Sequence, residues 1–457
     1  MCEWGSGHEG WGREIGVSEE LAGKILELVG DRGDAEVLTS EGISSLTRFA
    51  NSFIHQNVGE HVEAVSLRVA VDGRVASGRT TRTDDEALRR FVDETLETAK
   101  RQPVDEDWPG LTAPVDIAPV DHFDEDTADT SPSVRAELVR TFVDEGEGML
   151  AAGYCETEGE THTFVNSAGQ HATGRATSAI LDGIHRTPTS AGSGHAASTA
   201  IGDLDASAVG ALAAKRARDS EKTFDAKPDS YEVVLAPDAV GSIAVFLAFY
   251  GFNAKAHEEG QSFVEIGEEQ FDPGFRFWDD ATDPRTRGVA FDSEGTPKQR
   301  LDLVKAGTTA GLAHDRRTAK KAGVESTGHG FPGSETFGPA PFNLFIGPGS
   351  ATEEELIAGV ERGIYVSTFH YSRVLDPKPL VVTGLTRNGT FMIENGKITG
   401  AVSNLRFTQS FIEALAAGNI IGIGSNERLA DSEFGAGFVH APALSLASWH
   451  FTGGAEG

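Results

Sequence analysis

The dipeptide His257-Glu258 brings together two side-chain types that hydrolytic zinc sites use. Such a site needs imidazole, carboxylate or thiolate ligands that converge on the metal, and a carboxylate near the bound water to accept its proton. A helix usually supplies the first ligands by placing a second histidine one turn after the His-Glu pair. Positions 261 and 262 hold Gln and Ser, so His257 has no such partner, and Gly260 weakens a helix at this point. The pattern therefore predicts an exposed, polar helix end.

Other histidines stand in patterns that could serve a site. His329 lies in the segment "STGHGFPGS", whose small residues are typical of either a substrate-facing loop or an ordinary turn. His440 and His450 lie on an alternating stretch, residues 437–451, where isolated histidines are more often packed or solvated than metal-bound. The sequence contains no G-x-S-x-G elbow and no P-loop, and "GIGSNE" lacks the third glycine of a dinucleotide fingerprint. These spacings alone identify no enzyme.

The composition of the chain limits its partners and its location. With 457 residues, 39% of them hydrophobic, it can bury the cores of two domains. The formal net charge of -31 argues against binding to nucleic acid or to an anionic membrane surface, because both would repel it. Only Cys2 and Cys155 are present, which excludes a disulfide framework. The start lacks a signal-peptide pattern and no apolar run could span a bilayer, so we expect a cytoplasmic protein.

The N-terminal half has the patterns of a helix-covered antiparallel sheet. Apolar residues recur at helical spacing in the segments 18–30, 84–102 and 132–150. Apolar and polar residues alternate, as in half-exposed strands, in the segments 35–42, 44–58, 60–81 and 154–183. Asp72-Gly73 is placed as a type I′ hairpin turn, and a second turn is expected at Ala168-Gly169.

The C-terminal half is predicted to be mainly β. The polar, unpatterned stretch 216–230 predicts a boundary between a domain of residues 1–225 and a domain of residues 226–457. After it, Asp238 is expected to cap a helix. Asn388-Gly389 and Asn395-Gly396 are expected to form turns between short strands. The fold class is therefore α+β, with a helix-covered antiparallel sheet first and a β-rich domain after it.

A series of short segments resembles the TldD/PmbA (TldE) peptidase family in order and spacing over nearly the whole chain. These segments are "SLTRFANSFIHQNV", "VSLRVAVDGRVASGRTT", "FVNSAGQ", "EGQSFVEIGE", "FDSEGTPKQRLDLVKAGTTAGLAHDRRTAKKAG", "STGHG", "NLFIGPGS", "GIYV" and "NGKITGAV". The resemblance implies an N-terminal α/β domain, a β-rich C-terminal domain, and dimers that enclose a proteolytic chamber. It also implies an obligate interface built mainly from the C-terminal domain.

The resemblance further indicates a branch of the family. In the TldD branch a helix bears His-Glu-x-x-x-His, and a cysteine near the C-terminus completes the zinc site. Anchored on "EGQSF", the three functional positions of that helix fall on Val245, Phe246 and Tyr250, none of which suits its role, and no cysteine follows Cys155. The surrounding residues make this helix apolar almost all round, as in a fully buried element. The chain thus resembles the metal-free TldE/PmbA branch.

The first hypothesis is therefore a non-catalytic, TldE-like subunit that pairs with a TldD-type catalytic subunit. We expect no catalytic residues, no metal and no cofactor in this chain, and zinc in the partner. The pair would hydrolyse small or unfolded peptides, with maturation of modified peptides or natural products as one setting. The resemblance places Thr327, Gly328, His329 and Asn343 along the substrate channel.

Two other hypotheses stay open at this point. In one, the chain is itself a metal-dependent hydrolase whose relocated site is drawn from His257, Glu258, His329 and His440. In the other, it is a peptide-binding scaffold that acts without any peptidase.

Overall fold

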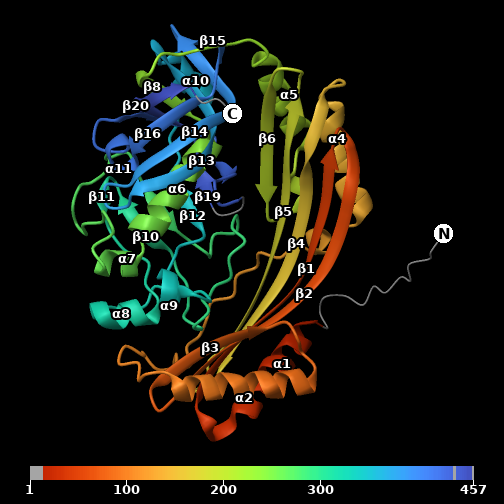
Figure 1. The fold of residues 1–457 in the computed structure, drawn as a ribbon, viewed down its shortest axis with the longest axis vertical. Coiled ribbons are helices and arrows are strands. Elements are labelled where there is room, and N and C mark those ends of the chain that lie inside the picture. The colour runs from red at the N-terminus through yellow and green to blue at the C-terminus, as the bar shows by residue number, and fades with distance from the viewer. Residues whose placement is uncertain (1–13, 436–438, 455–457) are drawn as a thin grey trace, which may run out of the picture.

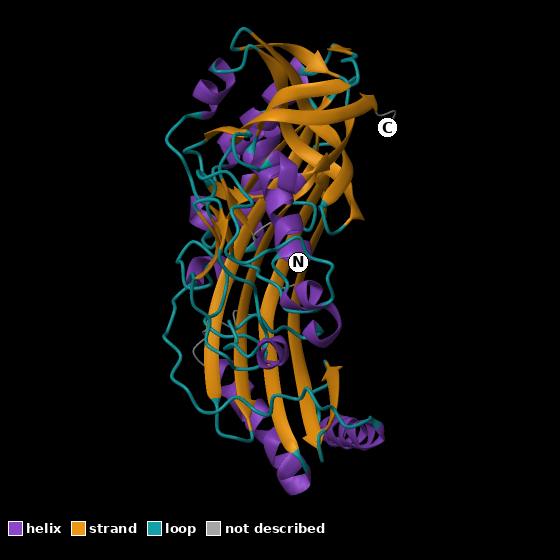
Figure 2. Cartoon of the chain, turned by 90° about the vertical axis from the view of Figure 1, so that its left-hand side faces the viewer, coloured by secondary structure: helices purple, strands orange, loops and turns teal. Residues whose placement is uncertain are grey.

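A long, six-stranded antiparallel sheet forms the first half of the computed structural model, which describes residues 14–435 and 439–454. Its strand order is β3-β2-β1-β4-β5-β6, and its longest strands run along the long axis of the molecule (Figure 1, Figure 2). The strands are β1 (Asp34–Ala50), β2 (Phe53–Val71), β3 (Arg74–Thr80), β4 (Leu150–Asn166), β5 (His171–Arg186) and β6 (Ala191–Ser198).

Tight turns fix the register of this sheet. Asp72 and Gly73 have φ values of 49° and 72°, and they join β2 to β3 as the predicted type I′ hairpin. The predicted turn at Ala168-Gly169 joins β4 to β5. A further hairpin at Asn51 and Ser52 (φ 51° and 65°) divides the second predicted strand, whereas β2 continues through Gly59 without a break.

Helices cover the sheet, as the apolar spacing predicted. The helical segments of this half are α1 (Glu14–Val29), η2 (Gly30–Arg32), α2 (Asp85–Arg101), α3 (Glu125–Ala128), α4 (Pro132–Asp144), η3 (Ile201–Asp203) and α5 (Ala206–Asp219). The buried face of α2 packs Leu88, Val92 and Leu96 against β2 and β3. The third predicted helix is shorter than expected: α4 ends at Asp144, because Glu147 and Gly148 adopt positive φ values (50° and 95°) before β4.

Two further sheets form the β-rich C-terminal half. One has the order β11-β10-β9-β12-β19-β18 and the other β13-β8-β20-β16-β14-β15-β7, with β17 paired to β20. The strands are β7 (Thr223–Phe224), β8 (Asp229–Leu235), β9 (Phe277–Asp279), β10 (Leu301–Lys305), β11 (Thr308–Thr309), β12 (Leu344–Ile346), β13 (Arg362–Asp376), β14 (Val381–Glu394), β15 (Lys397–Val402), β16 (Leu405–Ser410), β17 (Ile420–Ile423), β18 (Arg428–Ala430), β19 (Val439–Ala441) and β20 (Leu444–Gly454).

The core of this half lies between the two sheets around α6. Its helical segments are α6 (Pro237–Phe246), η4 (Leu247–Gly251), α7 (Ala254–Glu258), α8 (Arg316–Ala322), α9 (Ser334–Phe337), α10 (Glu353–Ala358) and α11 (Phe411–Ala414). Strands from both sheets contact α6, which makes it the central element of one large apolar cluster. The α+β class, with a helix-covered antiparallel sheet followed by a β-rich region, is confirmed. The boundary between residues 225 and 226 stays a prediction.

Two local predictions were wrong. Asn388-Gly389 is not a turn between strands but lies inside β14, because pairing with β13 continues on both sides of it. The φ values of Asn388 and Gly389 (54° and 143°) instead accompany a shift of register. Asn395-Gly396, by contrast, does join β14 to β15 as expected.

Asp238 does not cap α6. The helix begins after Ala236 with Pro237 in its first turn, and no side chain caps it. The buried Asp238 carboxylate instead accepts hydrogen bonds from the Arg428 guanidinium (2.7 Å) and the Asp431 backbone N–H (3.0 Å). The ion pair with Arg428, a residue distant in sequence, thus takes the place of the helix cap predicted for Asp238.

Cys2 lies outside the described residues, and Cys155 is buried, which raises the pKa of its thiol to about 12. Among the helices that the structure describes, none is long and apolar enough to cross a membrane.

Candidate functional site

The helix that the resemblance aligns with the metal motif is buried on every side. Each residue of α6, from Pro237 to Phe246, is buried, and the following turn η4 is π-helical. Val245 and Phe246 are only 1% and 2% exposed. Burying polar side chains at this place would cost desolvation free energy. The apolar sequence of the helix avoids this cost and favours its position in the core. The predicted burial is confirmed.

Aromatic rings fill the space around the aligned positions. The Phe246 ring stacks on Tyr250 at 6.0 Å between centroids, and meets Phe411 at 6.0 Å and Phe434 at 5.4 Å edge to face. Such contacts add to the stabilisation from burial alone. Zinc in proteins is held by nitrogen, sulfur or carboxylate oxygen. The side chains of Val245, Phe246 and Tyr250 therefore do not fit a zinc ion.

The His257-Glu258 pair forms a polar helix end, as predicted. Both side chains are exposed at the end of α7, whose start is capped by the side chain of Asn253. Glu258 forms an ion pair with Lys321 of α8 at 3.1 Å. An exposed ion pair of this kind contributes little to stability.

The side chain of His329 is fully buried, so it is not a solvated residue of a surface turn. Its Nε2 lies 3.1 Å from the Asp279 carboxylate of β9, and its Nδ1 lies 2.8 Å from the Thr327 hydroxyl. The other oxygen of Asp279 accepts the backbone N–H of Asn343 at 2.6 Å. Burial alone would raise the pKa of Asp279, but the hydrogen bond and charge of His329 hold that pKa below its ordinary value.

Three of the four predicted channel residues thus meet around Asp279, a residue that the sequence did not single out. The Thr327 hydroxyl contacts the His329 ring, and the Asn343 backbone N–H donates to the Asp279 carboxylate. Gly328 lies between Thr327 and His329 with φ 73°, and a Cβ there would come within 2.8 Å of the Pro297 carbonyl oxygen. The sequence signal that could have indicated Asp279 is the alternating segment "FRFWDD", which ends in acidic residues. That these residues line a substrate channel stays a prediction.

His440 is packed rather than available to a metal. Its ring stacks on Phe345 at 4.6 Å, and its Nε2–H donates to the Arg285 carbonyl oxygen at 3.1 Å. Burial lowers the pKa of His440 to about 4. Within residues 14–435 and 439–454, no three His, Cys, Asp or Glu side chains gather in a group that could hold a metal ion. The four residues of the relocated-site hypothesis are therefore not brought together.

A buried ionic cluster, which the sequence did not predict, joins the first half to the second. The Arg68 guanidinium of β2 contacts Glu36 of β1 and, at 3.0 Å, Glu294 of the C-terminal half. It also lies over the Trp108 ring at 5.1 Å. Burial, offset in part by Arg68, raises the pKa of Glu36 to about 7. No spacing rule links residues more than two hundred positions apart, so no sequence pattern could reveal this cluster.

Arg68 lines two cavities. One, of about 290 Å³, includes Trp108 and Arg317, and the other, of about 350 Å³, includes Leu38 and Phe331. Phe331 belongs to the same glycine-rich segment as His329, so this segment links the Asp279 network to the cavity wall. One oxygen of the Glu36 carboxylate is buried without a hydrogen bond among the described residues.

Family models match both halves of the sequence. The model described as PmbA/TldA metallopeptidase domain 1 matches residues 35–99, and the PmbA/TldA metallopeptidase C-terminal domain matches residues 228–453. Together these ranges take in β1 to β3 with α2, and nearly all of the β-rich half.

Curated proteins and solved structures are similar as well. The metalloprotease TldD homolog of Haemophilus influenzae is 32% identical over 154 residues, which are 33% of this chain and 32% of that protein. A metalloprotease of Methanothermobacter thermautotrophicus is 25% identical over 205 residues, 44% of each chain. The matches therefore span less than half the length of these relatives. The crystal structure of TldE from Thermococcus kodakarensis superposes with a TM-score of 0.85 at 17% identity, covering 95% of this chain and 99% of that one.

Proposed function

Because this chain belongs to the PmbA/TldA metallopeptidase family, we propose that it is the non-catalytic, TldE-like subunit of a two-chain zinc peptidase. One observation carries the proposal: the helix positions aligned with the zinc motif are Val245, Phe246 and Tyr250, and aromatic side chains fill the space around them. A metal site rebuilt there would place polar ligands within the apolar core of the C-terminal half, which costs desolvation free energy.

The role that follows is structural support for a catalytic partner. The partner would be a TldD-type chain that carries the zinc ion, and the two chains would enclose a chamber that admits small or unfolded peptides. Similarity to the TldE fold over nearly the whole chain supports this pairing. Maturation of modified peptides or natural products is one setting for such a pair.

The experiment compares this chain alone, a TldD-type chain alone, and the two co-expressed. We expect this chain alone to contain less than one tenth of a zinc ion by elemental analysis, and the co-purified pair to contain zinc in the partner only. Hydrolysis of an unfolded peptide should require both chains. About one zinc ion in this chain alone, lost in His257→Ala or in His440→Ala, would instead identify a site of its own. Failure of the chains to co-purify would favour the scaffold hypothesis.

A further inference from the structure

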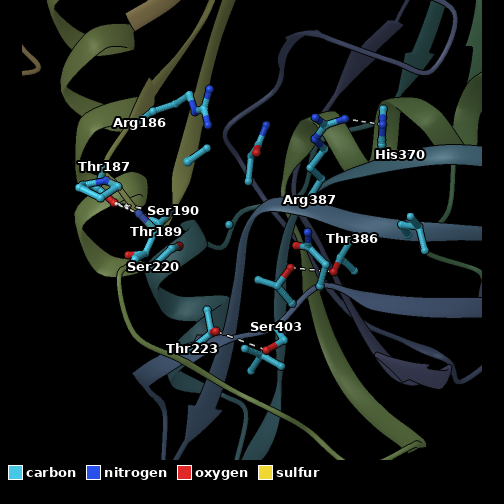
Figure 3. A pocket seen from close by; sticks show the side chains of 18 of the residues that line it. Arg186, Thr187, Thr189, Ser190, Ser220, Thr223, His370, Thr386, Arg387 and Ser403 are labelled. Carbon is cyan, nitrogen blue, oxygen red and sulfur yellow. Dashed lines mark hydrogen bonds between the residues drawn. The ribbon is translucent and has the colours of Figure 1, made fainter. Parts of the chain in front are cut away.

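A cavity of about 640 Å³ lies where the β5–β6 hairpin meets the strands of the C-terminal half (Figure 3). Its walls are the hairpin residues from Arg186 to Ala191, the end of α5 at Ser220, and parts of β13, β14 and the segment after β15. We refer to it as the hairpin cavity. It contains neither the aligned motif positions nor the His329 network, so it is a separate feature of the molecule.

The charge of this cavity is opposite to that of the chain. The protein has 70 acidic residues against 39 Lys and Arg, yet none of the described residues that line the hairpin cavity is Asp or Glu. The lining instead includes Arg186, Arg387 and His370, together with hydroxyl groups and the amides of Asn388 and Asn404. The charged side chains of this lining are therefore cationic, whereas the chain as a whole is strongly acidic.

Guanidinium groups face the cavity from opposite walls. Figure 3 shows Arg186 on the hairpin, and Arg387 with His370 on the β-sheet side. Within the described part of the chain, the Arg186 guanidinium has no hydrogen bond and no ion pair. Arg387 donates through Nη1 to Nε2 of His370, which leaves its other N–H groups for a ligand. The His370 ring therefore accepts at Nε2 and carries its proton at Nδ1.

Two acidic side chains beside the cavity, Asp219 and Glu433, have partners outside it. Asp219, next to the lining residue Ser220, pairs with Lys215 on the surface of α5. Glu433, whose charge acts on His370, accepts hydrogen bonds from the backbone N–H and the hydroxyl of Ser372. Neither carboxylate lines the cavity, and none of its described lining residues supplies an acidic counter-ion to the arginines.

The backbone around the cavity is strained. Tyr371 and Asn388, both in its lining, have φ values of 55° and 54°. A Cβ on the neighbouring Gly389 would lie 2.7 Å from the Ser367 hydroxyl. Non-glycine residues with positive φ cost stability and gather at binding sites, where they aim side chains that regular strands could not. Here the irregular part of β14 carries Arg387 into the cavity.

We propose that the hairpin cavity binds the carboxylate of a peptide between Arg186 and Arg387. A carboxylate matches the planar, forked donors of guanidinium groups. A cavity of about 640 Å³ is of the size that holds drug-sized organic ligands, and it far exceeds the needs of a free inorganic oxyanion. The amides and hydroxyl groups of the lining suit the N–H and C=O groups of a peptide. The choice of a peptide as the source of the anion rests on the proposed function.

The experiment measures binding to the purified chain, without a partner or any catalysis. The probes are an N-acetylated alanine hexapeptide with a free C-terminal carboxylate, the same peptide as its C-terminal amide, and inorganic phosphate. We expect the free acid to bind about 10-fold more tightly than the amide, and Arg186→Gln and Arg387→Gln each to weaken the free acid about 10-fold. Arg186→Lys should retain part of the affinity, because it keeps the charge but loses the fork. Arg140→Gln, on the exposed face of α4, is the matched control and should bind as the wild type does.

Several outcomes would overturn the proposal. These are equal affinity for the acid and the amide, no detectable binding of the acid at millimolar concentration, or unchanged binding in both arginine variants with unchanged thermal unfolding. Phosphate that binds as tightly as the peptide acid would assign the cavity to free oxyanions and refute the peptide source. Because the chain is tested alone, failure to pair with a TldD-type subunit and failure to bind the carboxylate are separate results.

Discussion

The imidazole of His329 is fully buried and lies 3.1 Å, at Nε2, from the carboxylate of Asp279, which is itself 1% exposed. The contact ties the glycine-rich segment to β9, fifty residues earlier in the chain. A buried pair of this type costs desolvation, and it is retained only where both members keep their partners.

Removing the histidine should leave a buried, unpaired carboxylate. We expect His329→Ala to lower the free energy of unfolding by roughly 3–5 kcal/mol, measured by urea denaturation. Asp279→Asn in the same background should restore part of the loss, because it removes the stranded charge. His257→Ala, an exposed histidine, is the control and should change stability by less than about 0.5 kcal/mol. Equal effects of the two histidine variants would refute the buried pair.

The ring of Phe246 should be a main support of the C-terminal core. Phe246→Ala removes contacts with Tyr250, Phe411 and Phe434, and should cost about 3–5 kcal/mol. Phe337→Ala makes the same chemical change at a side chain that is 74% exposed, and should cost less than about 0.5 kcal/mol. Thermal or urea unfolding of the two variants side by side measures the difference. A small loss in Phe246→Ala would contradict the packing of α6.

Gly328 should tolerate a side chain less well than another glycine with the same backbone. Both Gly328 and Gly323 have positive φ (73° and 68°), so alanine is strained at either position by about 1 kcal/mol. At Gly323 the new Cβ meets nothing within 4 Å, whereas at Gly328 it meets the Pro297 carbonyl oxygen at 2.8 Å. Gly328→Ala should therefore lower the melting temperature more than Gly323→Ala. Identical shifts would show that the segment can move away from Pro297.

Titration of His440 should weaken the fold in mild acid. Its folded pKa of about 4 lies below the ordinary value, so protonation favours the unfolded chain. The contribution of the neutral ring is complete above pH 6.5 and is lost as the pH falls toward 4, by up to ~3 kcal/mol. The charges of Arg285 and Asp283 act on the ring in opposite directions.

The measurement compares the unfolding free energy of the wild type with that of His440→Gln from pH 7.5 to 4. Groups that titrate in both proteins cancel in the difference, and glutamine keeps a donor for the Arg285 carbonyl. The advantage of the wild type over the variant should shrink as the pH falls. A difference that stays constant would contradict the lowered pKa, and His257→Gln serves as the exposed control.

Local sequence determined much of the architecture of this protein. The apolar spacing of α2, the Asp72-Gly73 turn and the Asn395-Gly396 turn were predictable, because each depends on neighbours within a few residues. The apolar run that became α6 predicted a helix buried on every side, and its position in the family pattern indicated that the metal motif was replaced.

Tertiary structure decided how the polar groups pair and which cavities they line. The Asp238 carboxylate could have capped its own helix or paired with Arg428. The fold brings the Arg428 guanidinium within hydrogen-bond distance, and this charged donor forms the stronger interaction. Asn388-Gly389 has the composition of a turn, but pairing with β13 on both sides kept it within a strand. The Arg68 cluster and the hairpin cavity each join segments that lie far apart in sequence, so only packing of the two halves could create them. Side chains that meet through long-range packing leave no periodic signal in the sequence, because spacing records only contacts within one element.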